Sequence, residues 1–287
     1  MNVKIASAQY DISFLGIWSA YRNKVERWVN EAAGRDARIL LFPEYASMEL
    51  ASLFSKDVYA SLSLQLAAMQ SVLDDYIDLY RTLALKHQCY IQSGTFPVHM
   101  PDNEYRNRAY LFMPNGDVDF QDKLMMTRFE NEQWLIKRGN ELKCFDTEFG
   151  KIAINICYDS EFPLLARQQV EAGASLILVP SCTDTLAGYH RVRIGCQARA
   201  LENQCYVVQS PTVGKAPWSE AVDVNIGAAG IYTPVDRGFP DDGILAMGEL
   251  NAVQWVFAEI SLEACEKVRA DGQVFNYRDW PLQNAYS

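Results

Sequence analysis

Short apolar runs without polar alternation constrain this chain more than any other feature. Residues 39–42 (ILLF) and 175–179 (SLILV) carry apolar side chains at nearly every position. A strand of this kind would be buried on both faces, so helices should flank the sheets. Each run is also far shorter than the roughly 18 residues that cross a bilayer as a helix. The chain is therefore predicted to adopt an α/β fold with no membrane span.

The rest of the sequence alternates strands with helices. Apolar runs bounded by Gly, Pro, Asn or Asp predict nine strands, at residues 3–8, 37–42, 89–96, 109–113, 152–156, 175–179, 205–209, 228–232 and 255–260. Helical periodicity predicts helices at residues 18–33, 62–86, 161–172, 189–203 and 262–270. No linker or repeat divides the chain, so we expect one domain over residues 1–287. Its last dozen residues are expected to form a tail that packs on the body or on another subunit.

The net charge, the cysteines and the histidines limit which binding partners and which cellular compartment we expect. The net charge of −10 repels phosphate backbones and no Lys/Arg cluster offsets it, so we expect no nucleic-acid partner. The seven cysteines are odd in number and form no CxxC pair, which indicates free thiols in a reducing compartment. The start MNVKIASAQY lacks the pattern of a signal peptide, so we expect a cytoplasmic protein. None of the three histidines stands in a zinc-ligand pattern, and no metal is expected.

Cys157 is the first candidate for chemistry. It closes the buried run KIAINIC and precedes YDSEFP, which predicts a strand, a sharp turn and a helix. A nucleophile on such a turn stands at the end of its strand, where the N–H of the next residue, Tyr158, is free to bind an oxyanion. The competing interpretation is a buried core cysteine, a common fate of a free thiol.

Two charged residues are candidate partners for this thiol. Histidine is scarce, and His190 lies in no Cys-His motif, so a carboxylate is the better base. Glu44 follows the buried run RILLFP at the carboxyl end of a predicted strand, where ligand sites of α/β sheets gather. Lys123 follows a hairpin predicted by Asn115 and Gly116; beside Cys157 it would lower the thiol's pKa and stabilise an oxyanion. A solvated loop glutamate and a surface lysine are the competing interpretations.

Taken together, these residues resemble the nitrilase superfamily of carbon-nitrogen hydrolases, whose sites use Glu, Lys and Cys in that chain order. The resemblance rests on SAQY, LLFPE with Glu44, Lys123, CYDSEFP with Cys157, VPSC and RALENQCYVVQSPTVG. It implies a four-layer αββα sandwich of two mixed sheets with outer helices, and a homodimer or higher homo-oligomer. It also implies a second glutamate, which is Glu130 by its spacing from Lys123 or Glu132 by the spacing back from Gly139.

Several further residues are candidates for the wall of the pocket. Ser181, Cys182 and Thr183 follow a buried strand and either line the pocket or cap the strand as polar residues. Trp134 and Tyr158 are candidates to shape it. Arg199, Glu202 and Asn203 are interpreted as scaffold that fixes a helix end.

The predicted reaction is hydrolysis of a non-peptide carbon-nitrogen bond through a thioester on Cys157, without metal or cofactor. An amidase acting on a small molecule is the first choice, by analogy with the family. N-carbamoyl amide hydrolysis, nitrile hydrolysis, acyl transfer from the same thioester, and a catalytically silent binding protein remain alternatives. The substrate stays open, although the negative charge favours a cationic or neutral molecule over a polyanion.

Overall fold

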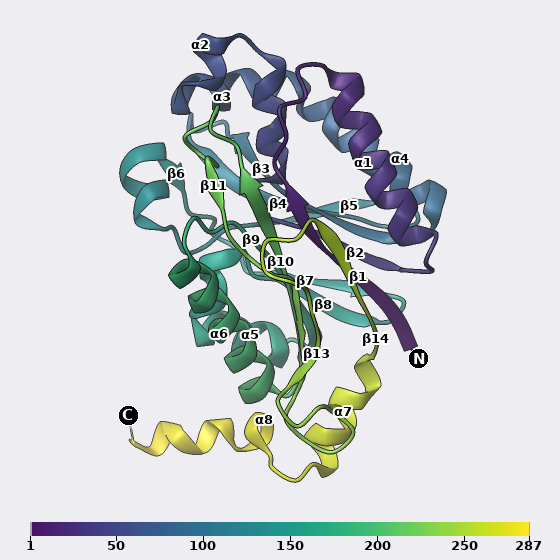
Figure 1. Cartoon of the computed structure of the whole chain (residues 1–287). Helices are drawn as coiled ribbons and strands as arrows, with labels where there is room; N and C mark the ends of the chain where they lie inside the picture. Colours follow the sequence, from purple (N-terminus) through teal and green to yellow (C-terminus); the bar gives the residue numbers. More distant parts are fainter. Residues whose placement is uncertain (1, 287) are drawn as a thin grey trace.

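A computed structural model describes residues 2–286 (Figure 1). The strands are β1 Asn2–Asp11, β2 Ile39–Phe42, β3 Tyr90–His99, β4 Tyr105–Phe112, β5 Val118–Asp122, β6 Ile136–Lys137, β7 Cys144–Thr147, β8 Gly150–Ile154, β9 Ala174–Ser181, β10 Tyr206–Lys215, β11 Val224–Asn225, β12 Gly230–Tyr232, β13 Ile244–Met247 and β14 Gln254–Ser261. The α-helices are α1 Trp18–Ala33, α2 Lys56–Tyr59, α3 Leu62–Met69, α4 Leu73–His87, α5 Pro163–Glu171, α6 Leu186–Asn203, α7 Leu262–Asp271 and α8 Asn276–Asp279. Shorter helical turns are η1 Ala46–Leu53, η2 Gln70–Val72, η3 Glu130–Trp134, η4 Cys157–Glu161 and η5 Trp280–Tyr286.

The sheet has two similar halves. One is built on the parallel strands β1, β2 and β3, and the other on the parallel strands β10, β9 and β8, each flanked by antiparallel strands. The halves join where Tyr10 pairs with Thr212 and Asp11 with Val213. Helices α1 and α4 lie outside one half, and α5 and α6 outside the other (Figure 1). The predicted α/β fold with outer helices is thus confirmed as a mixed, curled sheet flanked by helices; the division into four layers stays a prediction.

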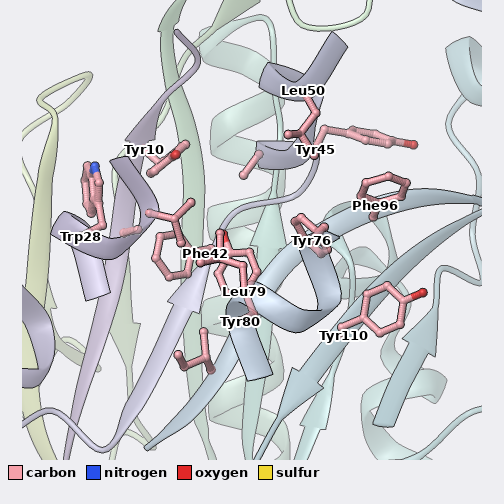
Figure 2. Packing of buried hydrophobic residues seen from close by; sticks show 14 of the residues in the cluster. Tyr10, Trp28, Phe42, Tyr45, Leu50, Tyr76, Leu79, Tyr80, Phe96 and Tyr110 are labelled. Atoms are coloured by element: carbon pink, nitrogen blue, oxygen red, sulfur yellow. The ribbon is translucent and has the colours of Figure 1, made fainter. Parts of the chain in front are cut away.

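An aromatic core fills the space between the first half of the sheet and its helices. Helix α1 buries one face at a spacing of three or four residues, and α4 does the same, because a helix turns once in 3.6 residues. Figure 2 shows rings from both helices and the strands meeting in this core. Most neighbouring rings cross at an angle or edge to face, as between Tyr10 and Phe42 at 5.7 Å and Trp28 and Trp255 at 5.1 Å.

The opposite face of β1 and β2 belongs to a second core. Ile5 and Ile39 belong there to one cluster that also contains apolar residues of β8, β9 and β10 and of helices α5 and α6. Strand β9 is buried along its whole length, which explains why its sequence lacks alternation. The apolar runs at residues 39–42 and 175–179 are therefore buried strands.

All nine predicted strands and the helices at 18–33, 161–172, 189–203 and 262–270 match elements of the structure within a few residues. The predicted helix 62–86 is wrong as one element, because it breaks into α3, η2 and α4. The break lies at Gln70, whose side-chain amide donates to Pro97 O on β3 as well as to Leu66 O. The tail forms α8 and η5, and Arg167 of α5 holds it by donating to Tyr277 O at 3.0 Å. Within the described residues, no helix is long and apolar enough to cross a membrane.

Candidate active site

Cys157 lies on a sharp turn after β8. Its backbone φ of 49° falls in the left-handed region, which a residue with a side chain enters only when its surroundings hold it there. Buried Asp159 stabilises this turn, because its carboxylate accepts hydrogen bonds from Ile156 N at 3.0 Å and Met125 N at 2.7 Å. Arg199 also stabilises the turn by donating a hydrogen bond to Ser160 O at 2.9 Å. The thiol itself lies 3.7 Å from Cys182 O, at the end of the neighbouring strand β9.

Glu44 follows the carboxyl end of β2 and is buried. Strand β3 approaches the residue before it so closely that a Cβ on Gly94 would stand 2.2 Å from Pro43 O. The Glu44 carboxylate accepts hydrogen bonds from Lys123 Nζ at 2.8 Å and Asn107 Nδ2 at 2.9 Å through Oε1. Its Oε2 accepts one from Cys182 N at 3.1 Å. These donors fix the carboxylate on the side of the molecule where Cys157 stands.

Lys123 is buried and joins Glu44 to Glu130. Its ammonium donates to Glu130 Oε1 and Oε2 at 2.9 and 2.7 Å, in addition to Glu44. Glu130 begins the π-helical turn η3 and also accepts hydrogen bonds from Tyr45 Oη at 2.6 Å and Thr127 N at 2.9 Å. One lysine therefore serves two carboxylates, and the group as a whole carries an excess negative charge.

The electrostatics of the group separate the two glutamates. Burial raises the pKa of Glu44, an effect that Lys123 partly offsets. Burial also opposes ionisation of Glu130, but Lys123 and the hydrogen bonds around it bring its pKa below the usual value. Glu130 is thus the permanent counter-ion of the lysine, and Glu44 is the carboxylate able to take and return a proton.

The thiol and the ammonium respond to the same neighbours. Burial and the negative charge of Glu44 raise the pKa of Cys157 well above its ordinary value, with Lys123 acting in the opposite direction. Burial disfavours the ammonium, yet Glu130 and Glu44 raise the pKa of Lys123 well above the ordinary value. Cys157 therefore rests as a thiol beside a basic carboxylate, and Lys123 keeps its positive charge.

A cavity of about 670 Å³ opens onto these four groups. Of the residues predicted to shape the pocket, Trp134, Tyr158, Cys182 and Thr183 line it. Ser181 does not, because its hydroxyl is buried and donates to Ser210 O at 3.2 Å. Its side chain thus lies away from the space that a substrate would occupy.

The two candidates for the second glutamate differ in direction. Glu130 points into the site and contacts Lys123, whereas the side chain of Glu132 is 54% exposed and pairs with Arg128 at 2.9 Å. The spacing forward from Lys123 gave the residue that the structure brings to the lysine. Glu132 still lies on the wall of the cavity.

Sequence reasoning missed three contributors: Asn107, Tyr45 and Asp159. Asn107 contacts both carboxylates but sits in β4, two residues before the predicted start of that strand. Tyr45 directly follows Glu44, and its phenol reaches Glu130 across 85 residues of sequence. Asp159 was visible in the segment CYDSEFP, where an acidic residue two positions after the thiol signals a capped turn.

Comparison with known proteins gives concordant results. Residues 4–269 match the model of a family described as carbon-nitrogen hydrolase. The chain is 37% identical over 277 residues to a probable hydrolase, YhcX, of Bacillus subtilis, covering 96% of this chain but only 53%, about half, of that relative. It is 28% identical to a deaminated glutathione amidase of Dictyostelium discoideum, covering 70% of each chain. A carbon-nitrogen hydrolase of Helicobacter pylori has a similar fold, with a TM-score of 0.78, 16% identity and coverage of 99% of this chain and 94% of that one.

Proposed function

The chain belongs to the carbon-nitrogen hydrolase family, the nitrilase superfamily, and from this premise we propose that it is an amidase that works through a thioester on Cys157. One observation carries the proposal: Glu44, Lys123 and Glu130 form a single hydrogen-bonded group beside the thiol, and all four line one cavity. Core packing alone gives no reason to bury two carboxylates against one lysine at the wall of a cavity.

The proposed reaction begins with the thiol. Glu44 takes the proton of Cys157 as the sulfur attacks the carbonyl carbon of an amide, forming a C–S bond and an oxyanion. Lys123 and the N–H of Tyr158 stabilise that oxyanion. Glu44 then gives its proton to the leaving nitrogen, the C–N bond breaks, and ammonia or an amine departs from the thioester.

Hydrolysis of the thioester repeats the same proton transfers with water. Glu44 takes a proton from water, the hydroxide attacks the carbonyl carbon, and the C–S bond breaks. The proton returns to the sulfur and a carboxylic acid leaves. Glu130 has a supporting role, because its low pKa keeps Lys123 charged through the cycle. No step needs a redox partner, since bonds are exchanged only with water.

Amide hydrolysis is preferred over the alternatives on the strength of a relative. The Dictyostelium protein is described as an amidase, and it matches this chain over 70% of the length of each. N-carbamoyl compounds and nitriles would enter the same chemistry, and acyl transfer would follow if an amine reached the thioester before water. A silent binding protein is the least favoured, because it would have no use for a strained, buried thiol beside a basic carboxylate.

We also propose that two copies form the predicted homodimer by associating through the outer face of α5 and α6. Four large apolar side chains are exposed there: Leu164, Leu186, Ile194 and Leu201. Apolar patches of this kind mark surfaces that bind another protein. A single domain over the whole chain and a cytoplasmic location remain parts of the same proposal.

Ammonia release tests the proposal directly. Small amides, N-carbamoyl compounds and nitriles are supplied to the wild-type protein and to the Cys157→Ala variant, and ammonia is measured. We expect ammonia from amides with the wild type and none with the variant, together with an acyl adduct on Cys157 in mass spectra of the wild type. Equal release by both proteins would remove Cys157 as the nucleophile. If no compound released ammonia, acyl transfer or a binding role without catalysis would be favoured.

A further inference from the structure

Among the described residues, acidic residues outnumber basic residues on the cavity wall, and the basic residues have ion-pair partners whereas some of the acidic residues do not. Apart from Glu44, Lys123, Glu130 and Cys157, the cavity is lined by two arginines and five acidic residues: Arg128, Arg191, Glu132, Glu161, Asp184, Glu220 and Asp223. A substrate that enters this cavity must pass these side chains to bring its amide to the thiol. Their balance therefore bears on which substrates are favoured.

Both arginines already have carboxylate partners within the wall. Arg128 binds Glu132 through two nitrogen–oxygen contacts of 2.9 Å each, one to each carboxylate oxygen. Arg191 pairs with Glu161 at 3.6 Å. A substrate carboxylate would compete with these partners for the two cations. The wall is therefore less favourable to an anionic substituent than to a cation.

The remaining three acidic residues have no ion-pair partner in the described part of the chain. Asp184, Glu220 and Asp223 are exposed, and among the ion pairs of residues 2–286 none involves these three side chains. Asp223 accepts one hydrogen bond, from Val224 N at 2.8 Å. They come from two separate loops, one after β9 and one between β10 and β11, yet they line the same cavity. Three carboxylates without an ion-pair partner that line one cavity produce a local negative potential that attracts a cation.

Another part of the cavity wall is aromatic. Phe129 and Trp134 lie there with ring centroids 5.7 Å apart, and the Trp134 ring lies 4.8 Å from that of Tyr45. Tyr158 lines the cavity beside the thiol. Aromatic faces attract ammonium and guanidinium groups as well as alkyl chains, whereas they gain nothing from a carboxylate. This second feature is independent of the acidic residues and suits the alkyl chain of such a ligand.

We propose that the substrate of this enzyme is an amide with an ammonium or guanidinium group at the end remote from the scissile bond. The cation lies toward Asp184, Glu220 and Asp223, its alkyl chain lies along the aromatic wall, and its amide reaches Cys157. The proposal rests on the amidase function proposed above and adds the class of substrate. Because the three acids are exposed, their effect is modest and is weakened by salt.

A matched series of amides tests this preference. Hexanamide, 6-aminohexanamide and the monoamide of adipic acid have the same chain length and differ only in a neutral, positive or negative end. We expect kcat/KM to be about tenfold higher for the ammonium compound than for hexanamide, and lowest for the carboxylate, with the difference residing in KM. Raising the salt from 20 to 500 mM should remove most of the preference.

Charge-matched variants locate the origin of the preference. The triple variant Asp184→Asn, Glu220→Gln, Asp223→Asn should lower the ratio of the ammonium to the neutral compound toward one. A control that removes the same charge from exposed positions on α1, α4 and α7 is Glu31→Gln, Asp75→Asn, Glu266→Gln. We expect the control to keep the wild-type ratio, because a general effect of net charge would lower the ratio equally in both.

The outcomes separate this inference from the proposed function. Ammonia from all three amides without an ammonium preference would overturn the substrate class and leave the amidase intact. A preference that the triple variant and the control reduce equally would also overturn it. If no amide is hydrolysed, thermal stabilisation of the Cys157→Ala protein by the three compounds still decides: stabilisation strongest with 6-aminohexanamide supports the site, and equal or absent stabilisation contradicts it.

Discussion

Two buried glutamate–lysine pairs lie close together in this molecule and have different surroundings. Glu44 pairs with Lys123, and Glu49, only five residues later, pairs with Lys24. Both glutamates are almost fully buried, and burial raises the pKa of each, to about 7 for Glu49. By burial, ion pairing and pKa alone, the two pairs would be equally good candidates for a catalytic site.

Their surroundings distinguish them. Glu49 accepts hydrogen bonds from Tyr10 Oη at 2.8 Å and Ser13 N at 2.7 Å, as well as from Lys24, and it does not line the cavity. It ties η1 to β1 and α1, next to the aromatic core of Figure 2. The Glu44 pair has a second carboxylate, a thiol and open space beside it. A perturbed pKa indicates function only where a reacting group and room for a substrate accompany it.

The largest expected contrast follows from neutralising each glutamate in turn. Glu44→Gln should lower kcat/KM by about 10³-fold or more, because the thiol loses its base, while the fold is retained. Mass spectra should show no thioester on Cys157 when substrate is added. Glu49→Gln, the matched control, should keep kcat/KM per folded molecule within a few fold. If the two variants lost activity equally, the distinction between the pairs would be wrong.

The Lys24 pair should show its importance in stability. Lys24→Met leaves Glu49 buried without its cation, which costs about 3–5 kcal/mol of unfolding free energy at pH 8. Denaturant unfolding measures this cost. Catalysis by the molecules that remain folded should be close to normal. A small change in stability at pH 8, or a loss of kcat at full stability, would contradict a purely structural role.

The pH dependence of this cost has a definite sign. In the folded protein burial raises the pKa of Glu49 from 4.5 to about 7, so Glu49 binds its proton more tightly folded than unfolded. Its contribution to stability is full below pH 4.5 and is lost as the pH rises through 7. Without Lys24 the carboxylate is still less favourable, so the variant should lose most stability at pH 8 and recover part of it near pH 5.5.

The sequence predicted those site residues whose position depends on local pattern. Glu44 and Cys157 each follow a run of apolar residues, and parallel strands buried on both faces end at one edge of a sheet. The ends of these strands could therefore be located from the sequence, and Glu44 and Cys157 could be identified there as candidate site residues. The local sequence supported Lys123 less strongly, because only a predicted hairpin precedes it. Its assignment to the site rested mainly on the resemblance to a family.

Residues that depend on distant contacts escaped prediction. Asn107 reaches Glu44 across 63 residues of sequence, and nothing in the pattern around it signals that contact. The choice between Glu130 and Glu132 was open because their positions differ by only two residues, and the π-helical turn η3 decides which of them faces Lys123. The break at Gln70 likewise depends on strand β3, which no window of helical periodicity includes.

An intermediate effect is expected at Asp159, which belongs to the site without touching the substrate. Its carboxylate joins the segment after Lys123 to the turn that carries Cys157, through Met125 N and Ile156 N. Asp159→Asn replaces one acceptor oxygen by an NH₂ group that faces N–H donors, so the two segments should shift relative to each other. Small displacements of reacting groups lower rates strongly, and kcat should fall about 10- to 100-fold with little change in KM. Asp146→Asn, on an exposed position of β7, is the control, and a change mainly in KM would contradict a positioning role.

The smallest effect is expected at Glu132. Its side chain is largely exposed, and within residues 2–286 its one ion-pair partner is Arg128, which is more exposed still, so this ion pair contributes about 0–1 kcal/mol. Glu132→Gln should therefore change kcat/KM for hexanamide by less than about threefold, whereas Glu130→Gln removes the counter-ion of Lys123 and should be far more harmful. The variant also frees Arg128, so the adipic acid monoamide should gain relative to 6-aminohexanamide. A loss of activity in Glu132→Gln as severe as that of Glu130→Gln would assign the second glutamate to position 132, and the backward spacing from Gly139 would have been the better guide.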